Sequence, residues 1–402
     1  MQIKDRFFKI EGVIQHYAWG GHSFIHELLG VNEDSQLPCA EYWMGAHPSA
    51  SATFEQDGKK MSLYQLIQQD PEHTLTKRVM QQFGELPYLF KVLDVHEMLS
   101  IQVHPTKEEA EKGFEKEEAA GIPLNAPHRN YKDRNHKPEV MVALTDFWLL
   151  HGFRQKKELE IMLENIPEFR VLLPLFKKEG IRELYQFIME MSQDDVNQLL
   201  APLVKREIRH HQEGILTRQD PGWWVAKLYE GKDFSERIDK GIFSIYLFNI
   251  VQIHPGEAIF QNAGIPHAYL EGQNIELMAN SDNVLRGGLT PKHVDVPELM
   301  KHTCFEEVIP VVMKGVAGHN GETQYPCPVP DFGISRIELA NGFAFKSQAD
   351  SLEMMIVTAG TTLVNNQLVM KRGEVLALLP GCEYELSSSG KCTLFKAFVP
   401  KN

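Results

Sequence analysis

The segment SIQVHP places two side chains that could bind a metal ion two positions apart. In a β-strand, residues i and i+2 point to the same face, so Gln102 and His104 are expected to project together. The apolar Ile101 and Val103 then face the other way. Pro105 cannot donate to a strand ladder, which predicts that the strand ends beside His104. Two interpretations stay open, since an ordinary strand with one solvated face shows the same alternation.

Two further segments carry residues of the same chemical kind at predicted strand ends. In NHKPEVMVAL, Glu139 stands at the head of an apolar run, where a carboxylate needs a partner. A strand-end glutamate paired with Lys137 is the plain alternative. In NAGIPHAYLEG, Gly264 and Pro266 predict a tight turn, and His267 follows it at the edge of a strand. A histidine in that position is often a hydrogen-bonded structural residue, so a second interpretation stays open here too.

Together these segments supply one amide oxygen, two imidazoles and one carboxylate. That donor set suits a borderline divalent ion such as zinc, although glutamine is an uncommon zinc ligand. Neutral ligands with a single carboxylate leave the site with a net charge of about +1. Such a site attracts anionic oxygen and stabilises an enediolate.

Charged residues follow His267 at short intervals. Glu276 lies in QNIELMANSDN, Arg286 lies in NVLRGGLTPKH, and Lys292 follows shortly after. Arginine suits forked recognition of phosphate or of developing negative charge, while lysine offers a point charge. The glycine pair after Arg286 either lets the backbone approach a ligand or marks a turn.

The elements that must position these residues can be inferred from changes in residue composition and spacing along the chain. Residues 1–154 mix short β-branched and aromatic runs with Gly, Pro and Asn, which predicts strands joined by loops. Residues 155–240 place Leu, Ile and Met at helical spacing between charges, which predicts an all-helical insertion. Apolar, β-branched and aromatic runs typical of strands return at IFSIYLFNIVQIHPGEAIF, so residues 241–303 are expected to complete the first β unit. Turn signals between short apolar runs in residues 304–402 predict a second antiparallel barrel or jelly roll.

Bulk composition limits the classes of partner. The chain has 402 residues, is 43% hydrophobic and carries a net charge of −13, which suits two or three domains. Without a long basic run, nucleic acid or an anionic membrane is not expected as partner. The N-terminal MQIKDRFFKIEG lacks the apolar run of a signal peptide, and no segment has the length of a membrane span, so we expect a cytoplasmic protein. The cysteines are scattered without a C-x-x-C pair and are expected to be buried thiols. They are Cys39, Cys304, Cys327, Cys382 and Cys392.

With these motifs in order, the sequence resembles the type I mannose-6-phosphate isomerases, or phosphomannose isomerases, which are zinc enzymes of the cupin superfamily. The resemblance spans nearly the whole chain. It implies a mainly β fold, with a cupin-type jelly-roll catalytic domain (1–154 and 241–303), a helical insertion (155–240) and a C-terminal β-barrel or jelly-roll domain (304–402). One departure is DVHEMLS, where family members often carry a small or basic residue and a proline before the leucine; it affects only the geometry of a loop. The stretches that carry the resemblance are IQHYAWGG, EYWMGAHPSA, LPYLFKVLDVHEMLSIQVHP, NHKPEVMVAL and QNAGIPHAYLEGQNIELMANSDNVLRGGLTPKH.

The resemblance also implies roles for individual residues. One zinc ion per chain is held by Gln102, His104, Glu139 and His267. Arg286 matches the family's catalytic arginine. The residues that match those placed around the sugar phosphate are Ser100, Lys137, Tyr269, Glu276, Asp282 and Lys292.

The implied reaction is the reversible interconversion of mannose 6-phosphate and fructose 6-phosphate through a cis-enediolate, which feeds mannose into or out of glycolysis and GDP-mannose synthesis. Zinc and Arg286 hold the charge that develops on oxygen. We favour Glu276 as the base, because its apolar neighbours Ile275 and Leu277 could raise its pKa towards neutrality. His136 is the competitor for that role.

The remaining polar residues receive supporting roles. Lys137 is assigned to ring opening or to proton transfer at oxygen, and Lys292 with Ser100 to the phosphate, the anchor that orients the substrate.

Two rival functions suit a metal-binding β protein. A sugar-binding cupin without catalysis is disfavoured by the presence of Arg286, Lys137 and Glu276. An iron or manganese oxygenase usually uses two histidines and one carboxylate and needs neither an amide ligand nor an Arg-Lys cluster. We therefore expect a monomeric isomerase that acts on a small sugar phosphate.

Overall fold

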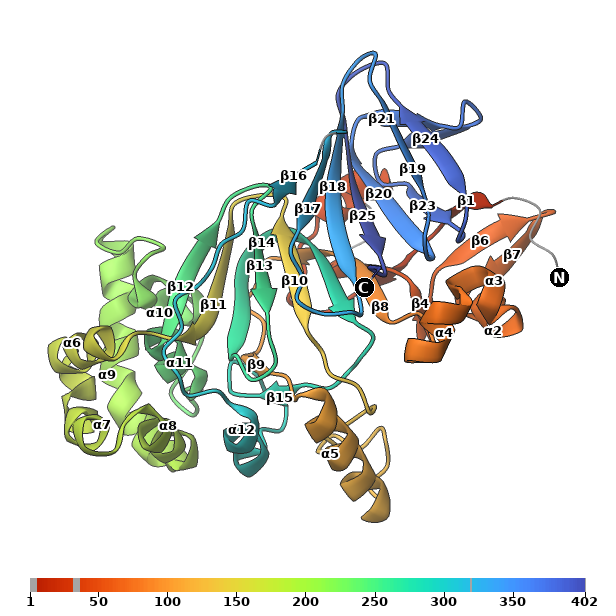
Figure 1. The fold of residues 1–402 in the computed structure, drawn as a ribbon. Coiled ribbons are helices and arrows are strands. Elements are labelled where there is room, and N and C mark those ends of the chain that lie inside the picture. Colours follow the sequence, from red (N-terminus) through yellow and green to blue (C-terminus); the bar gives the residue numbers. More distant parts are fainter. Residues whose placement is uncertain (1–5, 32–36, 319, 402) are drawn as a thin grey trace.

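The computed structural model describes residues 6–31, 37–318 and 320–401. The outer limits predicted for the first and last domains, residues 1 and 402, lie outside those residues. Figure 1 shows helices gathered at one end of the molecule, a β-sheet in the middle and a second β unit at the other end. None of the helices in the described ranges combines the length and the apolar character that crossing a membrane requires.

The middle sheet is built around one long strand, β14 (His267–Ala279). It pairs antiparallel with four other strands, so residues distant in sequence meet along it. The predicted strands at YLFKVLDV and EVMVAL are confirmed as β8 and β10. The other strands of this sheet are β2 (Val13–Gln15), β3 (Glu41–Met44), β8 (Tyr88–Val95), β9 (Gln102–Val103), β10 (Glu139–Ala143), β11 (Phe147–Phe153), β12 (Phe248–Ile253), β13 (Ala258–Gln261) and β15 (Leu285–Arg286).

The side chains of this sheet enter four apolar clusters, three of which bear on the site. Ile275 and Leu277 of β14 pack with residues of the C-terminal unit. Ala268 and Leu270 of the same strand pack with the helices. A third cluster, which includes Tyr269, joins residues from β8, β10, β11, β12 and β13 and forms an apolar interior next to the predicted site residues.

The helices predicted within residues 155–240 are present, with one correction just after that range. The stretch GIFSIYL was expected to be strand, but it forms α11 (Gly241–Leu247), whose seven residues are all buried. An apolar run that is buried on every side has no periodicity that distinguishes helix from strand. The side chain of Asp239 accepts from the backbone N–H of Gly241 at 2.7 Å at the start of this helix. The preceding helices are α6 (Lys156–Asn165), the 3₁₀ helix η1 (Pro167–Leu172), α7 (Leu173–Glu179), α8 (Ile181–Glu190), α9 (Gln193–Gln212) and α10 (Pro221–Tyr229).

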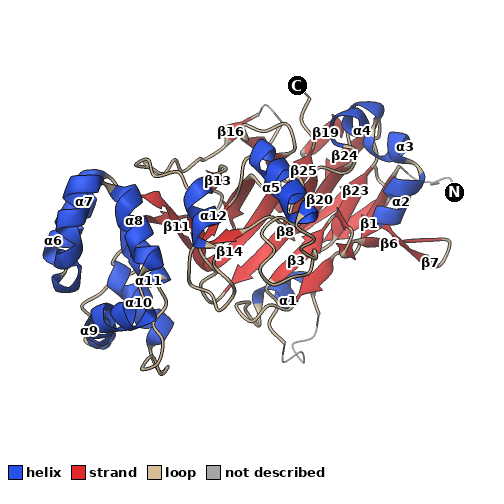
Figure 2. Ribbon diagram, turned by 90° about the horizontal axis from the view of Figure 1, so that it is seen from below, coloured by secondary structure: helices blue, strands red, loops and turns tan. Residues whose placement is uncertain are grey.

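The first β unit also contains helices that the sequence analysis did not predict, besides two hairpins that suit its prediction of strands joined by loops. Figure 1 places α5 and α12 at the same end of the middle sheet as β9 and β15, and the view from below in Figure 2 shows both helices near that end. These elements are α1 (Phe24–Leu29), α2 (Leu63–Gln69), α3 (Pro71–Leu75), α4 (Lys77–Phe83), α5 (Lys107–Ala119), α12 (Val296–His302), the hairpin β4 (Ala46–His47) with β5 (Ala50–Ser51), and the hairpin β6 (Thr53–Gln56) with β7 (Lys59–Ser62).

The C-terminal unit consists of a seven-stranded and a four-stranded sheet around a common apolar core. The predicted turns at TAG, NNQ, KRGE, LPG and SSSG each separate two strands. One strand was not expected here: β1 (Phe7–Ile10), from the start of the chain, pairs with β23. The seven-stranded sheet contains β1, β23 (Val375–Leu378), β20 (Glu353–Ala359), β25 (Cys392–Phe398), β18 (Gly333–Leu339), β17 (Glu322–Tyr325) and β16 (Val316–Ala317). The four-stranded sheet contains β19 (Ala344–Gln348), β24 (Glu383–Ser387), β21 (Thr361–Val364) and β22 (Leu368–Lys371).

The cysteines are all free thiols, as expected. Cys39, Cys382 and Cys392 are buried, whereas Cys304 and Cys327 are only partly buried. The prediction of burial is therefore correct for three of the five.

Candidate metal centre and active site

Two histidines and one glutamate from separate segments form a cluster suited to a metal ion. His104, Glu139 and His267 each offer a ligand atom, and these atoms lie within 4.8 Å of one another. Nε2 of His104 lies 3.5 Å from Glu139 Oε1, and Nε2 of His267 lies 3.3 Å from Glu139 Oε2. All three side chains are buried. The fold thus brings together three of the four predicted ligands.

Hydrogen bonds behind the imidazoles fix which ring nitrogen faces the cluster. Nδ1 of His104 donates to the carbonyl of Asn283 at 2.8 Å, and Nδ1 of His267 donates to the carbonyl of Ile265 at 2.9 Å. Because a carbonyl only accepts, the proton of each neutral ring is on Nδ1 and Nε2 presents a lone pair. Nε2 of His104 has no hydrogen-bond partner among the described residues.

Lone pairs from two imidazoles and a carboxylate therefore converge inside the protein. This arrangement is repulsive unless a cation lies between the donor atoms. Burial lowers the pKa of His104 to about 4, so its ring is neutral, the form that binds a metal. Burial works to raise the pKa of Glu139, yet the positive charge of Lys137 holds it well below its ordinary value. Two imidazole nitrogens with one ionised carboxylate fit zinc.

Strand register brings Gln102 and Arg286 to the same place. Gln102 pairs with His267 on β14 and with Arg286 on β15. Directly paired residues on neighbouring antiparallel strands share a face, so the three side chains form a row. Ile101 and Val103 pack in the apolar core on the opposite side. The alternation predicted for SIQVHP is therefore confirmed.

A cavity of about 50 Å³ lies beside the cluster. Lys137 lines it, with Nζ 3.2 Å from Glu139 Oε1. This volume holds the reacting end of a small molecule rather than a whole sugar phosphate. The polar residues that line it are Glu41, Lys91, Gln102, Lys137, Glu139, His267, Tyr269 and Glu276.

Glu276 reaches this cavity because β14 contains an irregularity. On β11, Leu149 pairs with Tyr269. Its neighbour Trp148 pairs with Glu271, so β14 accommodates one extra residue between these two pairs. A bulge of this kind reverses the alternation of the side chains that follow it. Tyr269 before the bulge and Glu276 after it therefore point to the same face.

Glu276 is buried beside a lysine that the sequence analysis missed. Nζ of Lys91 lies 3.2 Å from Glu276 Oε2 and 3.2 Å from Glu41 Oε2. Burial raises the pKa of Glu276, against the positive charge of Lys91. The expected cause of that burial was wrong: Ile275 and Leu277 pack in the core on the other side of the sheet. The Glu276 carboxylate is instead desolvated by its place in the small enclosed cavity on the opposite side of the sheet.

The sequence did contain a signal for Lys91. It interrupts the apolar run YLFKVLDV, and all eight residues of the corresponding strand β8 are buried. A lysine in such a strand is rarely buried without an acidic partner. Glu41 is held in turn by Trp43, whose Nε1 donates to Glu41 Oε2 at 2.5 Å.

Two predicted residues face other groups. His136 does not line the 50 Å³ cavity; its Nε2 pairs with Asp331 Oδ1 at 2.9 Å beside a separate cavity of about 430 Å³. Asp282 is exposed, and its carboxylate lies 3.4 Å from His47 Nε2.

The residues predicted at the phosphate lie on the Arg286 side of the site. Ser100 precedes Gln102 by two positions, and the neighbouring Ile101 donates its N–H to the carbonyl of Gly288 at 3.0 Å. Partial burial, together with the charge of Arg286, lowers the pKa of Lys292, so the two cations lie within electrostatic reach of each other. Burial also lowers the pKa of Arg286.

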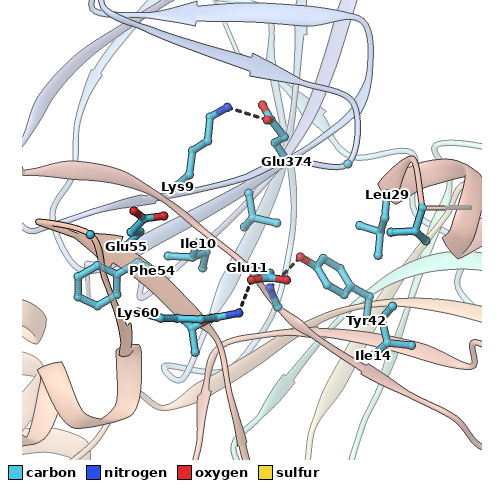
Figure 3. A pocket seen from close by; sticks show the side chains of 16 residues that line it. Lys9, Ile10, Glu11, Ile14, Leu29, Tyr42, Phe54, Glu55, Lys60 and Glu374 are labelled. Atoms are coloured by element: carbon cyan, nitrogen blue, oxygen red, sulfur yellow. Dashed lines mark hydrogen bonds and ion pairs between the residues drawn. The ribbon is translucent and has the colours of Figure 1, made fainter.

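A larger cavity of about 580 Å³ is lined mostly by residues from the range 9–60, with residues 373–375 of the C-terminal unit beside them (Figure 3). Ion pairs of Lys9 with Glu374 and of Lys60 with Glu11 lie beside it, each with a 2.6 Å contact. None of its described lining residues belongs to the predicted site. The metal-ligand cluster with its small cavity is therefore the candidate active site.

Comparisons with known proteins identify the family of the chain. Residues 7–156 match the family model described as phosphomannose isomerase type I, catalytic domain. The chain is 39% identical over 374 residues to mannose-6-phosphate isomerase of Escherichia coli strain K12, covering 91% of this chain and 93% of that protein. It is 37% identical over 404 residues to the Salmonella typhimurium enzyme of the same name, covering 97% and 99%.

Solved structures give the same result over the whole fold. One similar structure is mannose 6-phosphate isomerase from Salmonella typhimurium bound to fructose 6-phosphate and zinc, with a TM-score of 0.87 and 35% identity, covering 99% of this chain and 100% of that one. A zinc-bound structure of mannose 6-phosphate isomerase matches equally well, with a TM-score of 0.87. On the shared sequence and fold, the chain belongs to the type I phosphomannose isomerase family.

Proposed function

We propose that this chain is a zinc-dependent aldose–ketose isomerase that interconverts mannose 6-phosphate and fructose 6-phosphate through a cis-enediolate. The observation that carries the proposal is the convergence of buried lone pairs from His104, Glu139 and His267, with Arg286 on the strand next to them. A similar Salmonella protein has been solved with fructose 6-phosphate and zinc, which supports the same substrate class here.

Four residues are proposed to hold one zinc ion: Gln102, His104, Glu139 and His267. When bound, the ion supplies a Lewis acid that stabilises negative charge on a substrate oxygen. Gln102 completes the set through its position in the row with His267, because its side chain lines the same cavity.

Glu276 is proposed as the group that moves the proton between the first and second carbons. Its carboxylate lines the cavity, and burial raises its pKa towards the range in which a carboxylate can both take and return a proton. His136 competes less well for this role, because its Nε2 is engaged by Asp331 away from the cavity.

Arg286 and Lys137 are proposed to stabilise and move charge at the substrate oxygens. Arg286 is half-buried, and a guanidinium with reduced solvation interacts strongly with an oxyanion. Lys137 lies 3.2 Å from Glu139 at the edge of the cavity, where it can donate a proton to an oxygen during ring opening.

The phosphate is proposed to lie on the side of Ser100 and Lys292, with Tyr269 and Asp282 near the sugar. Lys292 and Arg286 form a local cationic site in a chain of net charge −13. Such a local site is needed before an acidic protein can attract a dianionic phosphate.

Fold details and cellular context are also proposals. We propose that the first β unit (1–154 and 241–303) is a cupin-type jelly roll, that residues 155–240 are an insertion, and that residues 304–402 form a second jelly-roll domain. The enzyme is proposed to act as a cytoplasmic monomer that connects mannose with glycolysis and GDP-mannose synthesis.

Metal analysis combined with a coupled isomerase assay tests the function. Zinc-loaded protein should contain one equivalent of zinc and form fructose 6-phosphate from mannose 6-phosphate. His104→Ala should lose both properties, whereas Arg286→Ala should retain zinc and lose turnover. Zinc-replete wild-type protein that leaves mannose 6-phosphate unchanged would refute the proposal.

A further inference from the structure

We propose that Asn283 is a positioning residue that holds the metal ligands and the catalytic segment in register. The inference rests on the proposed function, because it assumes that His104 and Glu139 bind the ion. Asn283 is buried, with 1% of its surface exposed, and it lies in the loop between β14 and β15, three positions before Arg286.

The backbone of Asn283 acts on the metal ligand directly. Its carbonyl accepts from His104 Nδ1 at 2.8 Å. This bond places the proton on Nδ1 and aims Nε2 at Glu139, 3.5 Å away. A partner of this kind sets both the tautomer and the orientation of a ligating imidazole.

The side chain of Asn283 acts on a different segment, residues 132–135. Its Oδ1 accepts from the backbone N–H groups of Lys132 at 2.7 Å and Asp133 at 3.3 Å. Its Nδ2 donates to the carbonyls of Asn135 at 2.8 Å and Asp133 at 2.9 Å. One buried amide thus uses its donors and its acceptor on a single loop, which serine or alanine at this position cannot do.

The segment that Asn283 holds leads directly into the active site. Residues 132–135 are followed by His136, Lys137 and, at the start of β10, Glu139. Asn283 therefore connects three strands that carry site residues. It contacts His104, which follows β9, and residues 132–135, which precede β10, and it precedes β15 in the chain.

Neighbouring side chains reinforce the same junction. The backbone N–H of Asp282 donates to Asp133 Oδ2 at 2.7 Å, and Ser281 Oγ donates to Asp133 Oδ1 at 2.9 Å. Nδ2 of Asn283 also lies 3.1 Å from Asp133 Oδ1. A carboxylate in place of the Asn283 amide would face that negative charge without a donor.

Two variants separate positioning from simple stability. Asn283→Asp keeps the shape and loses the two donors, and Asn283→Ala removes the side chain. Partners behind metal ligands are typically worth about 10- to 100-fold in metal affinity or activity, so we expect zinc affinity and kcat to fall by about that factor in both variants. The KM for mannose 6-phosphate should change less than about 3-fold, because Ser100 and Lys292 lie outside the segment.

The matched control is Asn197→Ala in the helical insertion. Asn197 also joins two segments, donating to the carbonyl of Glu236 at 2.9 Å and accepting from the N–H of Ile238 at 2.9 Å. This variant should lose thermal stability and keep wild-type zinc affinity and kcat.

Zinc affinity should be measured by competition with a chromophoric chelator, and the geometry by the visible spectrum of the cobalt-substituted protein. Weaker zinc binding and an altered cobalt spectrum in Asn283→Asp, with neither change in Asn197→Ala, would support the inference. If Asn283→Ala does not fold, Asn283→Asp decides the matter. If Asn283→Asp keeps the zinc affinity, cobalt spectrum and kcat of the wild-type protein, this inference is wrong and the proposed function stands. If the unmutated protein binds no zinc, both the inference and the proposed function are wrong.

Discussion

Lys91 offers the sharpest test of how the site controls its base. This lysine is buried, with 6% of its surface exposed, between two carboxylates that each lie 3.2 Å from its Nζ. Replacing it by methionine, Lys91→Met, keeps most of the volume and removes the charge. Glu41 and Glu276 are then left facing each other without a cation.

The size and the pH dependence of the stability lost in Lys91→Met follow from the burial of these three side chains. Removing one partner of a buried ion pair costs about 3–5 kcal/mol, because a charge stays behind without compensation. The pKa of Glu276 is already raised in the folded protein, so the stability linked to it is full at low pH and is lost as pH rises through the folded pKa. In Lys91→Met that pKa rises further. The variant should therefore be most destabilised above neutral pH and recover towards pH 5, where one carboxyl group binds a proton.

Catalysis gives the second readout. An opposite charge within a few ångströms lowers a carboxyl pKa by about 1–3 units, so its loss should move the acidic limb of the kcat/KM profile up by about that amount if Glu276 is the base. The assay is coupled isomerase turnover from pH 5 to pH 9, with denaturant unfolding at the same pH values.

A second buried lysine provides the control. Lys396 lies in the C-terminal unit, 2.7 Å from Glu322 Oε1 and far in sequence from the site. Lys396→Met should lose comparable stability and keep the wild-type pH–rate profile. An unchanged acidic limb in Lys91→Met would refute the assignment of Glu276 as the base that Lys91 tunes.

Three other perturbations have distinct expected outcomes. Arg286→Ala should retain zinc and lose about 100- to 1,000-fold in kcat, the usual cost of removing one group that stabilises an oxyanion, and unchanged turnover would exclude that role. Removal of zinc by a chelator should abolish isomerisation. The far-ultraviolet circular dichroism spectrum should stay unchanged, because none of the proposed metal ligands belongs to the large apolar cores that hold the fold together. Loss of the spectrum would show that the ion is structural. Burial raises the pKa of Glu353 from 4.5 to about 7, so the unfolding free energy of the wild-type protein should fall by about 3 kcal/mol as pH rises through that range. Glu353→Gln should remove this dependence, as measured by urea unfolding.

Local patterns predicted the residues whose positions depend on a single element. Gln102 and His104 share a face because strand alternation is local, and the helices of the insertion follow from their periodicity. The family resemblance then selected the same ligands. Three of them could be tested as a cluster by their distances, and they meet within 4.8 Å.

Features that depend on pairing between distant strands were not predictable in this way. The face that Glu276 occupies depends on a bulge opposite β11, and without that bulge strict alternation from His267 would place it on the other side. The pairing of β1 with β23 joins the first and last parts of the chain, and no local pattern specifies it. The segment of α11 is uniformly apolar, so its helical state was hidden by the same burial that stabilises it.

The charges around the cavity explain why the site needs each of its parts. Three carboxylates, from Glu41, Glu139 and Glu276, share the enclosed space with two ammonium groups, from Lys91 and Lys137. These groups alone leave a net charge of about −1, which would repel the enediolate of the proposed reaction. A bound divalent ion would change that to about +1, and proton uptake by Glu276, the proposed base, would add one more positive charge as charge develops on the substrate oxygen. The same balance accounts for Lys91: its ammonium group pairs with Glu41 and Glu276 and lowers the cost of keeping both carboxylates buried.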